Sequence, residues 1–418
     1  MRKKSKIPLS KESSVLFVTF SRWTNKKRLP TNGSIEPLRD FLLPKIKKLV
    51  IIDQLHPGSD GVMPRIEVFK NNSQKYKLYK SSWLVYWLYP FLKMSKSEKT
   101  QIRFKLRDFL SVIDWAIQDR TRYSFFIGLE SINTIAGIIL RSIGRVDVVV
   151  YYVSDYSPNR YPGKLFNDAY LWLDRFCAMH ADYIWDVSPA MQKARISVGL
   201  DPQKSAPVIG VANGLFPDQI KKNPLSKIKK HDLVYMGTLG AENGPDIAIQ
   251  SISLLNDKFK DIRLHIVGGT EKDSAWLKEI VKNLKLEDFV IFHGFIPSSI
   301  EMSKIIRGCA IGLAPYRSIP GSIRQYADAG KIRAYCASGL PVVSSYVPPL
   351  GIQLEKKGGA LLAHDNPKDF AKAINKLLSD EHMYEKLRND AYLFAKNSTW
   401  DNTFSNAFRN MDSIVLKY

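Results

Sequence analysis

Short apolar runs with the composition of β-strands alternate with amphipathic helical patterns along the first half of this 418-residue chain. The pattern predicts strands at 14–20, 48–53, 123–128, 146–153 and 182–187, and helices at 35–47, 103–117, 133–143, 165–179 and 190–198. A strand, a helix and the next strand form one crossover unit, and repeated units build a parallel sheet that helices cover on both faces. The alternation therefore predicts a doubly wound α/β domain.

The same alternation starts again after a polar, basic stretch at 221–230, which we interpret as a linker. The second series of strands is predicted at 233–236, 263–267, 290–292, 311–314, 341–344 and 359–362, with helices at 245–255, 274–284, 298–307, 330–337 and 367–378. The predicted fold class is thus α/β, with two Rossmann-like doubly wound domains. Ligands bind at the carboxyl ends of such strands, so we expect the two domains to face each other across a cleft.

The formal net charge is +22, and most of the basic surplus lies in residues 1–200. This surplus would attract an anionic membrane, a lipid-linked pyrophosphate or nucleic acid, although solvated lysines would also account for it. No recognised nucleic-acid-binding motif accompanies the charge, so we expect no nucleic-acid partner.

Three cysteines are too few and too scattered for a disulfide framework, which favours a reducing, cytoplasmic compartment. The longest apolar stretches are shorter than the roughly 20 residues that cross a bilayer. The segment 81–93 is rich in aromatic residues and flanked by lysines, so it is either a membrane or acceptor-lipid contact or a buried helix. We expect a cytoplasmic protein, either soluble or peripheral at the inner face of the membrane.

Glycine follows three successive strands of the second half, and it lets backbone N–H groups approach a phosphate at a helix N-terminus. The residues at these strand ends are Gly237, Thr238, Leu239, Gly240, Gly268 and Phe295. The turns match neither GxGxxG nor a GK[ST] loop, which disfavours a nucleotide hydrolase. Each could be a simple tight turn, but together they predict a ligand crevice.

The densest pattern runs from Tyr316, at a strand end, through a Gly/Ser/Pro loop to Tyr326 and a helix at 330–337. Lys331 falls in the first turn of that helix, where the helix dipole disfavours a cation unless an anion is present. Asp328 stands where an N-cap is expected. Lys331 is therefore either an anion ligand or a solvated lysine beside a capping Asp328.

The run Lys331–Val343, KIRAYCASGLPVV, resembles the signature K-[IVL]-x-E-Y-x-A-x-G-x-P-V-[IV] of GT-B glycosyltransferases, particularly family 4, also called group 1. Tyr235–Gly237, Leu264–Gly268, Val290–Phe295 and Ala391–Trp400 are similar to other parts of the family pattern. The resemblance implies a GT-B fold with a nucleotide diphosphate sugar as donor.

The resemblance also implies a division of labour along the chain. Residues 1–215 would bind the acceptor, 216–230 would be the linker, 231–397 would bind the nucleotide sugar, and a helix at 398–418 would cross back to the first domain. The glycine-bearing strand ends, with Tyr316, Tyr326, Asp328 and Lys331, would be the donor-binding residues.

The sequence departs from the family pattern in two places. The usual pair of glutamates aligns with Tyr326 and Ala334, and the usual Arg and Lys align with Thr238 and Asn243. The departures leave Lys331 and the backbone at 238–240 as the expected diphosphate ligands. They also make the chain similar, more distantly, to the inverting glucuronosyltransferase of xanthan assembly.

Candidate catalytic residues in the first half follow buried strands. Asp155 follows the strand at 146–153 and Glu130 follows the strand at 123–128, so either could deprotonate an acceptor hydroxyl as a general base. Asp155 could instead be a turn cap. Arg22 and His56 follow the first two strands and are candidates for acceptor binding.

The sequence has no DxD, HExxH or HxH motif, so we expect neither a metal nor another cofactor, and protein groups would neutralise the departing diphosphate. The predicted function is transfer of a sugar from a nucleotide diphosphate sugar to a polysaccharide or lipid-linked acceptor in cell-surface glycan synthesis. The alternatives are a sugar-nucleotide 2-epimerase of the same fold and a basic nucleic-acid-binding protein. The basic first half disfavours an epimerase, which needs no basic acceptor face.

Overall fold

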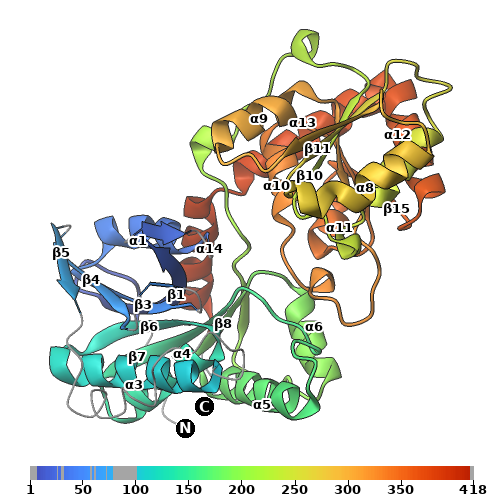
Figure 1. Cartoon of the computed structure of the whole chain (residues 1–418). Coiled ribbons are helices and arrows are strands. Elements are labelled where there is room, and N and C mark those ends of the chain that lie inside the picture. The colour runs from blue at the N-terminus through green and yellow to red at the C-terminus, as the bar shows by residue number, and fades with distance from the viewer. Residues whose placement is uncertain are drawn as a thin grey trace. The chain divides into compact units, whose positions relative to one another are not determined.

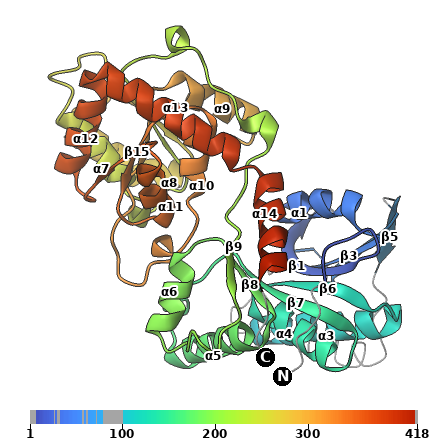
Figure 2. The same ribbon diagram turned by 180° about the vertical axis from the view of Figure 1, so that it is seen from behind.

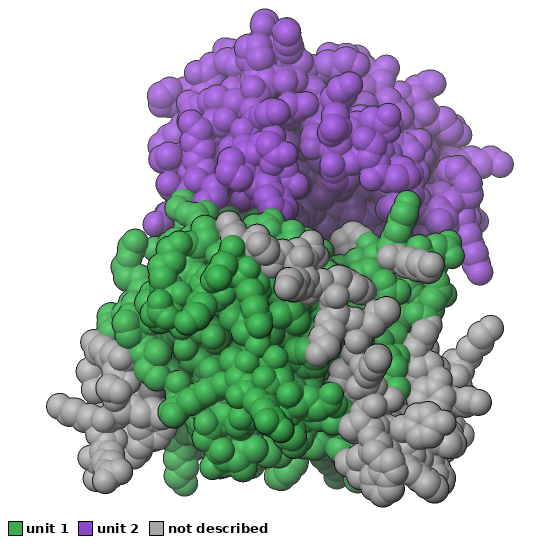
Figure 3. Space-filling view, turned by 90° about the vertical axis from the view of Figure 1, so that its left-hand side faces the viewer, with its two compact units in different colours: residues 1–212, 400–418 green, residues 213–399 purple. Residues whose placement is uncertain are grey.

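The computed structural model describes residues 7–25, 27–29, 33–56, 59–60, 63–71, 73–78 and 101–414. The chain divides into two compact units, Met1–Ala212 together with Trp400–Tyr418, and Asn213–Thr399 (Figure 3). The segment 81–93 lies outside the described residues. Within the described part of the chain, no helix combines the length and hydropathy needed to cross a membrane.

The first unit is built on a nine-stranded sheet in the order β5-β4-β3-β1-β6-β7-β8-β9, with β2 paired to β1. Its strands are β1 (Ser14–Thr24), β2 (Lys27–Leu29), β3 (Lys48–Leu55), β4 (Arg65–Lys70), β5 (Ser73–Leu78), β6 (Tyr123–Leu129), β7 (Val146–Val153), β8 (Tyr183–Asp186) and β9 (Val208–Gly210). The strands predicted as parallel are parallel, but β2, β4 and β5 pair antiparallel. Connections that lack a helix allow only antiparallel neighbours here, so the sheet is mixed.

Helices cover both faces of this sheet. They are α1 (Ile35–Leu42), α3 (Gln101–Asp119), α4 (Glu130–Ser142), α5 (Lys164–His180), α6 (Ala190–Ser197) and α14 (Trp400–Ser413). Figures 1 and 2 show α3, α4 and α5 together on one face, and α1 with α14 on the other. The ring of Phe408 in α14 packs against Phe41 of α1 and Trp185 of β8, at 5.8 and 5.3 Å between ring centres. The last helix therefore completes the core of the first unit.

The second unit has six parallel strands in the order β12-β11-β10-β13-β14-β15. They are β10 (Asp232–Met236), β11 (Arg263–Val267), β12 (Val290–Gly294), β13 (Ile311–Ala314), β14 (Val342–Ser345) and β15 (Ala360–Ala363). The helices are α7 (Pro245–Ser253), α8 (Glu271–Asn283), α9 (Ser299–Gly308), α10 (Gly330–Ala337), α11 (Pro349–Lys356), α12 (Pro367–Ser379) and α13 (Glu381–Asn397). The strand order reverses between β10 and β13, which makes that position the switch point where a ligand is expected.

The stretch predicted as a linker, 216–230, belongs to the second unit. The Lys221 N–H donates to the Ala337 carbonyl at 2.9 Å, and the Lys229 N–H donates to the Gly308 carbonyl at 3.0 Å. These backbone hydrogen bonds attach a polar segment that has no apolar periodicity, so composition alone did not reveal its attachment.

Candidate active site

At the switch point of the second unit, the Tyr335 hydroxyl lies between two diverging strands. β10 and β13 pair from Leu233 to Tyr235 and then separate. The buried Tyr335 hydroxyl accepts a hydrogen bond from the Met236 N–H at 2.8 Å and donates one to the Leu313 carbonyl at 3.1 Å. This side chain satisfies backbone groups that the ladder leaves unpaired, and it thereby fixes the opening between the strand ends.

The glycine turns after β10 and β11 have positions that only glycine fits. Gly237 has φ +127°, and an added Cβ would lie 3.6 Å from the Lys331 Nζ. An added Cβ at Gly268, where φ is +126°, would lie 2.2 Å from the Gly237 carbonyl oxygen. Leu239 is buried, so only its backbone can face a ligand. The predicted turns are therefore close backbone approaches at one edge of the sheet.

Lys331, in the first turn of α10, is buried directly beneath the turn at Gly237. Its side chain is 7% exposed, and its Nζ has no hydrogen-bond partner among the residues that the structure describes. The ammonium lies 3.9 Å from the centre of the Tyr235 ring and 4.5 Å from that of Tyr316. Burial lowers the pKa of Lys331 well below its usual value, and the positive charge of Arg324 lowers it further. The alternative of a solvated lysine is wrong.

Asp328 is not the N-cap of α10, whose N-cap position is Ala329. The Asp328 carboxylate accepts hydrogen bonds from the Arg333 Nε at 2.9 Å and from the Asn213 N–H at 2.7 Å. The prediction that Asp328 caps the helix is wrong because its carboxylate instead binds Arg333 and Asn213, and these bonds hold the loop before α10. Asp328 therefore shapes the site through the backbone of that loop.

Thr238 and Asn243, which replace the family's Arg and Lys, bind each other. The Asn243 Nδ2 donates to the Thr238 Oγ1 at 2.8 Å, and the Tyr235 hydroxyl donates to the Thr238 carbonyl at 2.6 Å. The hydrogen bond between Thr238 and Asn243 thus joins two neutral side chains within the loop after β10. The loop thus offers no cation at either position.

The other predicted donor residues lie at the same edge. Tyr316 follows β13 and is buried against Lys331, Phe295 follows β12 with an exposed ring, and Tyr326 is half-buried after a 3₁₀ turn at Ile323–Gln325. Sequence reasoning missed Arg324 in that turn, whose Nη2 donates to the Glu242 Oε1 at 3.2 Å. The sequence did contain a signal for Arg324, because this basic residue lies two positions before Tyr326, which aligns with a glutamate of the family pattern.

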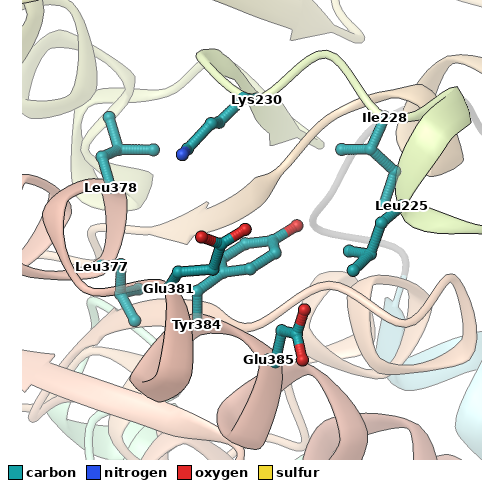
Figure 4. A pocket seen from close by; sticks show the side chains of 8 residues that line it. All are labelled: Leu225, Ile228, Lys230, Leu377, Leu378, Glu381, Tyr384 and Glu385. Atoms are coloured by element: carbon teal, nitrogen blue, oxygen red, sulfur yellow. The ribbon is translucent and has the colours of Figure 1, made fainter.

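A small hollow of the second unit lies away from this edge (Figure 4). It is lined by Leu225, Ile228, Lys230, Leu377, Leu378, Glu381, Tyr384 and Glu385. Lys230 precedes β10, so the hollow lies at the amino-terminal edge of the sheet, whereas Lys331 lies at the carboxyl edge. It shares no residue with the candidate site.

In the first unit, the structure brings the two predicted carboxylates together. Glu130 follows β6 directly, with φ +66°, an uncommon conformation for a residue other than glycine. Its Oε1 accepts hydrogen bonds from the Ser154 Oγ at 3.0 Å and from the Asp155 N–H at 3.4 Å. Burial raises the pKa of Glu130, the positive charge of Arg160 opposes the rise, and the negative charge of Asp155 adds to it. Asp155 itself is exposed.

Two residues that sequence reasoning missed frame these carboxylates. The Arg160 Nη1 donates to the Asp155 carbonyl at 2.6 Å, and its guanidinium lies 5.6 Å from the centre of the Tyr170 ring. Tyr170 is buried, and its hydroxyl has no partner in the described part of the chain. Arg160 lies in an irregular loop and Tyr170 on a helix, so no periodic signal joined them to Glu130.

Arg22 and His56 lie at the same sheet edge, on the side of β1 and β3. Arg22 does not follow its strand as predicted, because β1 continues to Thr24 and pairs with β2, where Arg22 opposes Leu29. His56 follows β3 as predicted, and its N–H donates to the Ser21 carbonyl at 2.9 Å. Both side chains are exposed. The order β3-β1-β6-β7 thus sets His56, Arg22, Glu130 and Asp155 along one edge.

No three His, Cys, Asp or Glu side chains within the described ranges lie together in a way that could hold a metal ion. Independence from metal remains a prediction.

Comparison with known proteins shows which proteins the chain is similar to. Residues 230–380 match the family described as glycosyl transferases group 1. An uncharacterized glycosyltransferase of Haemophilus influenzae is 27% identical over 197 residues, which are 46% of this chain and 52% of that protein. The chain therefore spans about half the length of this curated relative.

Solved structures share the fold over nearly the whole chain. Anabaena HepE, crystallised with UDP, has a TM-score of 0.67 at 16% identity, covering 96% of this chain and all of that one. WaaG, a glycosyltransferase involved in lipopolysaccharide biosynthesis, has a TM-score of 0.61 at 12% identity, covering 95% and 99% of the two chains. Residues 230–380 are thus similar to the group 1 glycosyl transferases, and the chain has the GT-B fold.

Proposed function

We propose that the chain is a glycosyltransferase that moves a sugar from a nucleotide diphosphate sugar to a glycan or lipid-linked acceptor in cell-surface glycan synthesis. The observation that carries the proposal is Lys331, a buried lysine without a hydrogen-bond partner among the described residues, beneath a glycine turn at the switch point. Burying an unpaired charge is costly, so such a site favours an anionic ligand. A diphosphate at this position would restore the charged form of Lys331.

The identity of the donor is supported by the neighbours of the fold. HepE has been solved with UDP, with UDP and glucose, and with UDP-glucose. In this chain, the backbone after Gly237 and the first turn of α10 would hold the diphosphate together with Lys331. We expect these protein groups, without a metal, to neutralise the charge that develops on the departing nucleoside diphosphate.

We place the acceptor hydroxyl at the carboxylates of the first unit. One carboxylate would take the proton of that hydroxyl as its oxygen attacks the anomeric carbon and the bond to the diphosphate breaks. The raised pKa of Glu130 brings its basicity closer to neutral pH, which suits a general base. Asp155, one residue from the Ser154 that holds Glu130, is the second candidate, and a base of either kind predicts inversion at the anomeric carbon.

We also propose that the first unit contacts an anionic membrane at the cytoplasmic face. Large exposed apolar side chains gather on or at the ends of α3, α4 and α5, which lie side by side on one face of the sheet (Figure 2): Leu106, Ile117, Ile139, Ile143, Leu165, Phe166 and Trp172. The exposed Lys105 directly precedes Leu106 in the sequence, and the exposed Lys164 directly precedes Leu165. Apolar contacts reinforced by basic residues favour an anionic bilayer surface.

The alternatives are less well supported. A sugar-nucleotide 2-epimerase takes no acceptor, so it would not need the basic surplus in residues 1–200. The curated relative is a glycosyltransferase, which also disfavours the epimerase. A nucleic-acid-binding protein would not need a buried lysine at a switch point.

Calorimetric titration with UDP, GDP and their sugar conjugates tests the donor assignment. We expect one nucleoside diphosphate to bind, and its sugar conjugate to compete with it for the same site. A chain that binds none of these compounds would not be a glycosyltransferase of this kind.

A further inference from the structure

Two cations, Lys331 and Arg324, reach the candidate donor site from different elements, and only one of them has a carboxylate partner. Arg324 lies in the loop between β13 and α10, and its Nη2 binds Glu242, which follows the glycine turn of β10. The Arg324 Nε is buried and has no hydrogen-bond partner among the described residues. The guanidinium therefore has unused donor capacity at the turn that covers Lys331.

The loop that carries Arg324 is fixed against the same turn. The Arg317 N–H donates to the Glu242 carbonyl at 3.0 Å, and the Arg317 Nε donates to the Ala241 carbonyl at 3.1 Å. Arg317 also forms an ion pair with Asp246 in the first turn of α7. These contacts keep the β13–α10 loop beside the β10 turn, so Arg324 is held at the site by more than its own ion pair.

Glu242 is a partner that a ligand could displace. Its side chain is 42% exposed and that of Arg324 is 32% exposed, and a pair this open to solvent contributes little stability. A diphosphate carries more negative charge than one carboxylate, and two of its oxygens can accept the two parallel N–H bonds that a guanidinium donates. The exchange of Glu242 for a diphosphate would thus be favourable.

We propose that Arg324 and Lys331 together hold the diphosphate of the donor, and that Glu242 occupies Arg324 until the diphosphate displaces it. Arg324 thereby supplies the positive charge that Thr238 and Asn243, hydrogen-bonded to each other, do not. The inference rests on the proposed function, because it assigns ligands to the donor site of that function. No covalent step is involved.

The experiment compares a nucleoside diphosphate with its monophosphate, using UDP with UMP and GDP with GMP as probes. Calorimetric titration of the full chain is expected to show tighter binding of the diphosphate. Arg324→Gln should weaken diphosphate binding roughly tenfold to a hundredfold, the range of a charge-assisted contact, and change monophosphate binding much less. Arg324→Lys keeps the positive charge but loses the paired N–H donors of the guanidinium. Its diphosphate affinity should therefore lie between those of the wild type and Arg324→Gln.

The matched control is Arg307→Gln. Arg307 lies at the end of α9, before β13, at the amino-terminal edge of the same sheet, where it cannot reach the donor site. Both affinities should be unchanged in this variant. Glu242→Gln should tighten diphosphate binding, because it removes the competing carboxylate.

Each other outcome overturns a stated part of the account. If Arg324→Gln and Arg324→Lys keep the wild-type ratio of diphosphate to monophosphate affinity, Arg324 is not a diphosphate ligand, and the proposed function stands without it. If Glu242→Gln weakens diphosphate binding, Glu242 is itself a ligand and the displacement is wrong. If the wild type binds no nucleotide, the proposed function fails and this inference fails with it.

Discussion

The Lys331 ammonium lies 3.9 Å from the centre of the Tyr235 ring, with no hydrogen-bond partner for its Nζ in the part of the chain that the structure describes. An aromatic face attracts a cation, but it does not replace the hydrogen bonds that water gives to an ammonium group. The Tyr235 ring therefore leaves the N–H donors of Lys331 available to a ligand.

The stability of the ligand-free chain should depend on pH through Lys331. Its pKa is lowered in the folded state, so between that value and the usual 10.5 the unfolded chain binds more protons. Stability contributed by this site therefore rises with pH in that window. Lys331→Met removes the titrating group, so the wild type should gain stability relative to the variant in thermal unfolding as the pH rises toward 10.5. A difference that stays constant with pH would contradict the lowered pKa.

Mutation should show which of the two carboxylates of the first unit, Glu130 or Asp155, is the general base. Loss of the general base typically costs 10²–10⁴-fold in rate, so Glu130→Gln should lower turnover by that order while nucleotide binding persists. Because the pKa of Glu130 is raised, activity should fall on acidification at a pH above its usual value of 4.5. Asp155→Asn is the matched test. If it lowers turnover while Glu130→Gln does not, Asp155 is the base and Glu130 is a positioning residue.

Helix α14 should be essential for the first unit. Phe404, Phe408 and Met411 are buried, and the Tyr183 hydroxyl donates to the Met411 carbonyl at 3.1 Å. Truncation of a buried Phe to Ala costs about 3–5 kcal/mol, so Phe408→Ala should lower the melting temperature markedly. A chain truncated after Asn397, which lacks the whole helix, should have a lower melting temperature than Phe408→Ala. Asn410→Ala, at an exposed position of the same helix, is the control, and equal melting temperatures for Phe408→Ala and Asn410→Ala would refute this packing role.

The face formed by α3, α4 and α5 should bind anionic vesicles. Leu165 and Trp172 are 80% and 61% exposed on α5. The double variant Leu165→Ser and Trp172→Ser should co-sediment less with phosphatidylglycerol vesicles than the wild type does, because it removes apolar contact area. Ile300→Ser, at an exposed position of α9 in the second unit, should bind as the wild type does. Equal retention of all three proteins would exclude this face as the contact.

Local patterns predicted the regular core of the molecule. The predicted bounds of β7, β11, β13 and α10 coincide with the observed ones, because continuous β-branched runs and short amphipathic segments leave few alternatives. The β4–β5 hairpin was not predicted, because charged residues at 65, 67 and 70 interrupt the apolar pattern of β4, although Ile66, Val68 and Phe69 are buried. The family resemblance is confirmed by the group 1 match and by the solved GT-B structures.

The candidate site was predictable only in part. The glycine turns, Glu130 and Asp155 follow strands, and Lys331 begins a helix between two strands. Parallel strands bring their carboxyl ends to one edge, so the placement of these residues could be inferred. The partners of these residues could not. The bond from Asn213 to Asp328 spans 115 residues, and whether a lysine is buried over two tyrosine rings depends on packing that no local pattern records.

The most direct test of the central claim is a transfer assay with labelled UDP- and GDP-sugars and a bacterial membrane glycolipid extract as acceptor. The account predicts that one nucleotide sugar is consumed, that its nucleoside diphosphate is released, and that the label enters the glycolipid fraction. Lys331→Ala should abolish or strongly reduce this transfer and weaken donor binding roughly tenfold to a hundredfold. Full transfer and unchanged donor affinity in Lys331→Ala, in a folded protein, would contradict the account.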